Sequence, residues 1–135
     1  MTTKIGDITL DRDMIFEDEF KTSLVRAEAT PTLGGGMVIQ EFQIPIEKGR
    51  LITLVSTESQ GMQKRSTVQL LKDLSDIANC TYPLEIKSNG KTFTKTVRFA
   101  NEVQGGAVQF EPFQVRQGFH SDSIYYKGSI NLMVV

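Results

Sequence analysis

The sequence is poor in the residue types on which much enzyme and metal chemistry depends. Its 135 residues include one histidine, one cysteine and no tryptophan. A single cysteine cannot form an internal disulfide, and one histidine with one cysteine cannot build a cysteine–histidine zinc site. The composition therefore argues against several enzyme classes, and we expect no cofactor and no metal.

The sequence also lacks a strong net charge and long apolar runs. Lys and Arg total 15, and Asp and Glu total 16, for a formal net charge of −1. A generic nucleic-acid-binding protein is usually strongly basic, so we expect no nucleic-acid specificity. The longest apolar run, 132–135, is far shorter than the roughly 20 residues of a membrane-spanning helix. Residues 1–7 contain no apolar signal segment, so we expect neither a membrane association nor a signal peptide.

The length favours a single domain over residues 1–135, because domains commonly hold about 100–200 residues. Within it, residues 1–36 are expected to form an acidic, partly extended segment and loop. Residues 1–28 hold seven acids and four bases, whereas residues 87–135 hold three acids and six bases. These complementary ends indicate either intramolecular pairing or complementarity between copies in a ring or stack.

Alternating apolar and polar residues predict that strands dominate the fold. The alternation and the turn residues predict a β-hairpin over 37–55, with its turn at 47–50. Asn89-Gly90 predicts a second hairpin, because this dipeptide favours the tight turns that join antiparallel strands. Residues 124–135 alternate regularly to the last residue and predict a final strand.

One segment has helical periodicity. A helix over about 66–78, capped by Ser66, is predicted by the spacing of its apolar residues, Val68, Leu70, Leu71, Leu74, Ile77 and Ala78. We therefore expect a mainly β (α+β) protein with one helix. Its antiparallel strands would form a rolled sheet, a β-sandwich or a barrel, with the helix covering one face. Cys80, just after the helix, is expected to be a small buried hydrophobe.

No motif indicates catalysis. His120 lies in a loop over 117–122, and the contiguous loop residues His120, Ser121 and Asp122 cannot converge as a catalytic triad. The triple glycine at 34–36 leads into a strand and lacks the helix N-terminus that a phosphate-binding loop requires. We expect a protein that is not an enzyme, with no catalytic residues.

The acidic N-terminal segment is the main candidate for a binding surface, because apolar residues beside acids are typical of interfaces. The candidate interface comprises Asp11, Asp13, Met14, Ile15, Phe16, Glu17, Asp18 and Glu19. A basic hairpin offers the complementary face, with Lys87, Lys91, Lys95 and Arg98. The alternative is that the apolar members of the first set complete the core. Phe93 and Phe99 share strand parity and are expected to point inward, which argues against binding of single-stranded nucleic acid.

An ordered set of short motifs along nearly the whole chain resembles small phage tail proteins. In the first half the motifs are residues 6–10, 18–20, 34–41 and 49–54. In the second half they are Leu71 and Leu74 followed by residues 82–84, 89–93, 97–99, 110–113, 122, 125–126 and 130–135.

The resemblance implies a tail-tube-like fold and a structural role near the baseplate end of the tail tube. The chain is similar in particular to the "ripcord" type of contractile-tail baseplate protein, which bridges tube, sheath and wedge parts. The implied partners are other phage tail proteins (tube, sheath or baseplate wedge) and further copies in a homo-oligomeric ring. The implied location is the tail or baseplate of the bacteriophage virion, after synthesis in the host cytoplasm. Family members often carry a Trp where this chain has Ile15-Phe16, so no specific contact is transferred.

The sequence leaves a second class of function open. A small β-barrel module could bind a carbohydrate or a peptide through an aromatic-lined cleft. Such a cleft needs aromatic side chains outside the core, whereas most aromatic residues here follow core parity.

Overall fold

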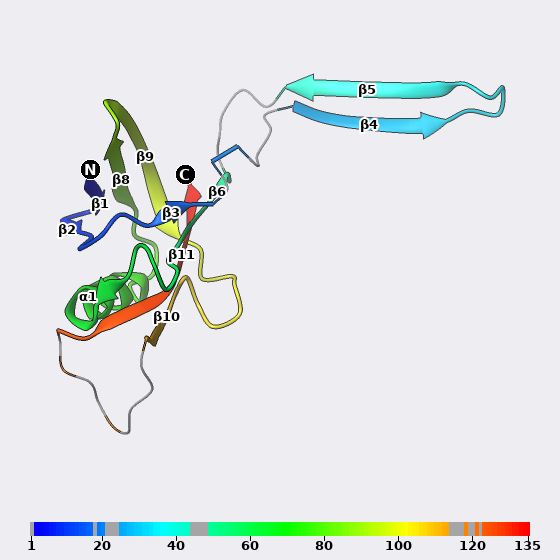
Figure 1. The fold of residues 1–135 in the computed structure, drawn as a ribbon. Helices are drawn as coiled ribbons and strands as arrows, with labels where there is room; N and C mark the ends of the chain where they lie inside the picture. The colour runs from blue at the N-terminus through cyan, green and yellow to red at the C-terminus, as the bar shows by residue number, and fades with distance from the viewer. Residues whose placement is uncertain are drawn as a thin grey trace.

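The computed structural model describes residues 2–17, 19–20, 25–43, 49–113, 118, 121 and 123–135. It confirms a mainly β protein with one helix and antiparallel sheets (Figure 1). The first strands are β1 (Thr2–Ile5), β2 (Ile8–Thr9), β3 (Ile15–Phe16), β4 (Val25–Pro31), β5 (Met37–Gln43), β6 (Leu51–Val55) and β7 (Gln63–Lys64). The helix α1 (Arg65–Ser75) follows, and then β8 (Tyr82–Ser88), β9 (Lys91–Phe99), β10 (Val108–Pro112) and β11 (Tyr125–Val134).

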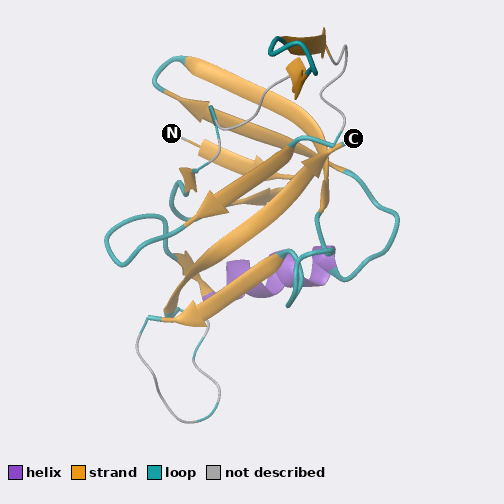
Figure 2. Ribbon diagram, turned by 90° about the vertical axis from the view of Figure 1, so that its right-hand side faces the viewer, coloured by secondary structure: helices purple, strands orange, loops and turns teal. Residues whose placement is uncertain are grey.

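The main sheet is organised around β11, the last strand. Its order is β2-β1-β8-β9-β11-β6-β3, and β10 and β7 also pair with β11. Figure 2 shows the strands in orange and the helix, in purple, beside them. Among the described strands, β2 and β3 end this order and do not pair with each other. The barrel alternative is therefore wrong. Both end strands have two residues, which is too short a ladder to close a sheet.

The core lies against the central strands of this sheet. Alternate residues of β11 are buried, as the period-2 pattern of the final segment predicted. The fully buried large side chains are Ile5, Ile52, Leu54, Gln63, Leu71, Leu84, Val97, Ile130 and Leu132. Phe99 belongs to the core and Phe93 packs against it, which confirms the inward direction inferred from their parity.

The Asn89-Gly90 hairpin is confirmed, and the 37–55 hairpin is wrong. Asn89 and Gly90 have φ values of 52° and 73°, as a type I′ turn between β8 and β9 requires. β5 pairs instead with β4, from Val25 opposite Gln43 to Pro31 opposite Met37. The glycine-rich turn after β4 closes a local hairpin, and β6 is drawn into the main sheet because Ile52 and Leu54 are buried beside β11.

The helix is shorter than the apolar spacing predicted, and its buried stripe differs. Its N-cap is Lys64, without a side-chain capping bond, so the expected Ser66 cap is wrong. Thr67, Leu71 and Ser75 form the buried stripe, whereas Leu70 is exposed. Cys80 is also exposed, which corrects the expectation that it is buried.

Among the described glycines, Gly128 lies closest to a neighbouring backbone. A Cβ atom at this position would lie 2.7 Å from the Cα of Phe110 and would overlap the carbonyl oxygen of Gln109. Ser56 holds the other side, because the Gly128 N–H donates to Ser56 Oγ at 2.6 Å and the Ser56 N–H donates to the Gly128 oxygen at 2.8 Å. Neither backbone can withdraw without breaking the pairing of β11.

We predict that Gly128→Ala lowers the free energy of unfolding by about 3 kcal/mol or more, because the methyl group meets backbone and not a flexible side chain. Urea denaturation measures the effect. The matched control is Gly34→Ala, where a Cβ meets nothing within 4 Å. Equal stability of the two variants would contradict the close approach.

Candidate functional site

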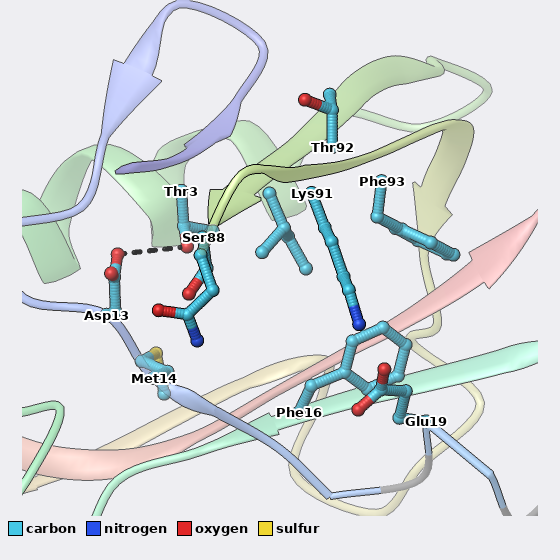
Figure 3. Close-up of a pocket in the computed structure, with 11 residues that line it drawn as sticks. Thr3, Asp13, Met14, Phe16, Glu19, Ser88, Lys91, Thr92 and Phe93 are labelled. Atoms are coloured by element: carbon cyan, nitrogen blue, oxygen red, sulfur yellow. Dashed lines mark hydrogen bonds between the residues drawn. The ribbon is translucent and has the colours of Figure 1, made fainter. Parts of the chain in front are cut away.

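The two sequence-predicted surfaces meet at one groove of the same chain, named here the hairpin groove. It lies between the N-terminal segment and the tip of the β8–β9 hairpin and has a volume of about 500 Å³ (Figure 3). Its lining comprises Thr3, Asp13, Met14, Phe16, Glu19, Ile86, Ser88, Asn89, Lys91, Thr92 and Phe93. Figure 3 shows the Lys91 side chain reaching across the groove toward Phe16 and Glu19.

Aromatic and cationic contacts fasten the N-terminal segment to the hairpin. The Phe16 and Phe93 rings meet edge to face with centroids 5.4 Å apart. The Arg50 guanidinium lies 5.7 Å from the Phe16 centroid and 5.6 Å from that of Phe93. Arg50 Nη2 also donates to the Glu19 carbonyl oxygen at 2.9 Å. These contacts make the end of the N-terminal segment one wall of the groove.

The candidate interface residues of the acidic segment have different roles. Met14 is buried in the core and Phe16 is half-buried against it, so part of the apolar set does complete the core. Ile15 is exposed, as are Glu17 and Glu19. Asp18 lies outside the described residues, as does His120.

The Asp11 carboxylate is hydrogen-bonded to the start of the helix. Its Oδ2 accepts the Thr67 hydroxyl at 2.6 Å and the Lys64 N–H at 3.0 Å. A carboxylate at this end also interacts favourably with the helix dipole. Asp13 similarly accepts the Thr3 hydroxyl at 3.2 Å. Both acids therefore hold elements of the chain together.

Gln63, which the sequence did not single out, fixes the position of Asp11. Its Oε1 accepts the Asp11 N–H at 2.8 Å, and its Nε2 donates to the carbonyls of Arg12 at 2.6 Å and Gly61 at 2.8 Å. The side chain is fully buried, so all its amide hydrogen bonds must be made within the protein. No local pattern signals this residue, because two of its three partners, Asp11 and Arg12, lie about 50 positions earlier in the chain.

The four basic candidates divide between two faces of the hairpin. Strand register places Lys91 and Lys95 on the face of Phe93, and Lys87 and Arg98 on the opposite face. Lys87 pairs with Glu85 at 2.8 Å, and Arg98 pairs with Glu102. The hydrogen bond from each base lowers the pKa of its carboxylate, Glu85 or Glu102, below the ordinary value. Of the four bases, Lys91 therefore lines the groove, and Lys95 lies further along the same face of β9.

A second feature, which the sequence did not predict, is a hairpin of β4, β5 and their turn. It covers residues 25–43 and is named here the arm. It projects from the main sheet in Figure 1, and all of its described side chains are exposed. Cross-strand pairs place apolar residues together on one side of it. This apolar face comprises Val25, Ala27, Ala29, Pro31, Met37 and Ile39, and Glu41, opposite Ala27, lies on the same side. The alternation over 25–31 was the available signal, since it has the period of a strand.

No protein-family model matches the chain, and neither a curated protein nor a solved structure matches it. In the part of the chain that the structure describes, no three His, Cys, Asp or Glu residues group closely enough to hold a metal ion. The helix found among those residues is not long and apolar enough to cross a bilayer.

We predict that Asp11→Ala lowers the free energy of unfolding by about 1–2 kcal/mol, because the helix start loses its accepting carboxylate. Thermal and urea denaturation measure the change. The control is Glu17→Ala, at an exposed position of the same segment, for which we expect less than about 0.5 kcal/mol. If Asp11→Ala leaves the free energy of unfolding unchanged, this carboxylate does not stabilise the helix.

Proposed function

We propose that this chain is a non-enzymatic structural protein of a bacteriophage tail, placed near the baseplate end of the tail tube and of the ripcord type. It acts through contacts between its own copies and with other tail proteins of the tube, sheath or baseplate wedge. The observation that carries the proposal is the arm with its uncovered apolar face. The ordered motifs that resemble small phage tail proteins support the same assignment.

The arm has the properties of an element that packs against a partner. An isolated two-stranded hairpin is marginally stable in water. Within the described chain nothing covers the apolar face, where Met37 is 57 % and Ile39 is 67 % exposed. Contiguous exposed apolar surface of this kind marks interaction sites, because burying it gains about 25 cal/mol per Å². The arm therefore suits a protein that completes its packing on assembly.

The body and the arm have complementary roles in the proposed tail-tube-like fold. The sheet around β11 supplies a packed body, and the arm extends beyond it (Figure 1). An extended element on a packed body lets one copy reach the next. If the arm of one copy contacts a different surface on the next copy, the contact repeats head to tail and forms a ring or a stack.

We predict that Met37→Thr with Ile39→Thr leaves the body folded and blocks tail assembly, since Thr keeps the strand propensity and removes the apolar contact. The variant replaces the wild-type gene in the phage that encodes it. Electron microscopy of the tails and titration of infectious particles give the readouts. We expect the number of infectious particles to fall at least tenfold, because removing two apolar side chains weakens a contact by about 2–3 kcal/mol.

The matched control changes the other side of the same strand. Val38→Thr with Gln40→Thr alters neighbouring residues whose register places them away from the apolar face. We expect normal tails from this control. Normal tails and titres from the Met37/Ile39 variant, or from phage that lacks the gene, would contradict the proposed function.

The hairpin groove favours one alternative, a module that binds a carbohydrate or a peptide. Its volume of about 500 Å³ lies within the about 300–1,000 Å³ of small-ligand pockets, and Phe16 and Phe93 contribute aromatic surface. In this reading, a glycan or peptide array gives a specific hit, and Lys91→Ala reduces binding at least tenfold. Lys87→Ala, on the opposite face, serves as the control. An array without a hit removes this alternative.

A further inference from the structure

We infer that the tip of the arm docks into a groove beside α1 on a second copy of this chain, with Leu33 as the inserted side chain. The inference rests on the proposed function, because it requires copies to associate. It adds the receiving site, named here the helix groove, which has a volume of about 360 Å³. The helix groove is lined by Gly6, Asp7, Ile8, Leu70, Asp73, Leu74, Tyr82 and Pro83.

The tip of the arm presents one large apolar side chain on a nearly bare backbone. Leu33 is 111 % exposed, more than any other large apolar residue of the described chain. Residues 34–36, which follow it, are all glycine. The turn is held by the Thr32 N–H donating to the Gly36 oxygen at 2.9 Å and by the Gly35 N–H donating to the Thr32 oxygen at 3.2 Å. The tip is thus an ordered turn that carries a single apolar group.

The helix groove has the size and the walls to receive that group. Leu70 is 54 % exposed, although it belongs to the helix that covers part of the core. Leu74, Ile8 and Tyr82 are half-buried and continue the apolar wall. An apolar cavity of about 150 Å³ already accommodates a benzene molecule, so about 360 Å³ has room for Leu33 and adjoining backbone.

The polar groups of the two partners also match. Asp7 and Asp73 line the otherwise apolar helix groove, where they can accept hydrogen bonds, Asp73 through the oxygen that does not already accept from Gln69 Nε2. Within the described residues, the backbone N–H groups of Leu33 and Gly34 donate to no other group of the chain. Backbone N–H groups bind carboxylates well, and a turn without charged side chains meets no like charge there.

The two surfaces lie on opposite sides of the molecule. In Figure 1 the arm extends from the top right of the body, whereas α1 and β2 lie at its left. An arm pointing away from the helix groove of its own chain can fill that of a neighbour. Because tip and groove are different surfaces, the contact is heterologous and propagates into a ring or a stack.

Disulfide trapping of the full-length chain tests the docking. In a Cys80→Ser background, one population carries Leu33→Cys and a second carries Leu70→Cys. The two are mixed under mild oxidation and separated on a non-reducing gel. We expect an interchain disulfide at least tenfold faster than in a mixture of Leu33→Cys with Val103→Cys, which is 41 % exposed outside the groove. Only a docked tip brings the first pair within the distance a disulfide requires.

Two outcomes overturn the inference. Equal rates for the two mixtures show that Leu33 does not select the helix groove, and preferential Leu33–Leu33 bonds show that arms pack on each other. Either result leaves the proposed function intact if the Met37/Ile39 variant still blocks tail assembly. Normal tails from that variant contradict the proposed function separately, whatever the disulfides show.

Discussion

The pairing of β11 with four other strands is the constraint on which the rest of the body depends. β9, β10, β6 and β7 all take their register from this last strand, and the buried residues of β11 lie at the centre of the core. Gly128 illustrates the constraint, since the β10 backbone crowds it on one side and Ser56 is hydrogen-bonded to it on the other. The helix is then fixed from outside at both ends. Asp11 accepts bonds at its start, and Asn101 Nδ2 donates to the Ser75 oxygen at its end at 2.8 Å.

The arm obeys a different constraint. Its strands pair only with each other, and its apolar face has no cover within the described chain. The body is held together by contacts between residues far apart in the sequence, whereas the arm is held together only by the pairing of two neighbouring strands. This division of roles is the physical basis of the proposed function, because it separates a part that folds from a part that associates.

The sequence predicted features whose signals are local. The Asn89-Gly90 turn, the alternation of β11 and the existence of the helix all follow from residue type and spacing. The partner of β5 could not be predicted in this way, since it depends on β6 being captured by β11 from the far end of the chain. The same limit applied to the site. Acids and bases were identified, but only the fold assigns Asp11 to the helix and divides the four bases between two faces.

Hydrogen–deuterium exchange of the chain, free and within assembled tails, shows whether the arm packs its apolar face only on assembly. We expect fast exchange of residues 25–43 in the free chain and strong protection in tails, while β11 is protected in both states. Equal exchange of residues 25–43 in the two states would contradict this expectation.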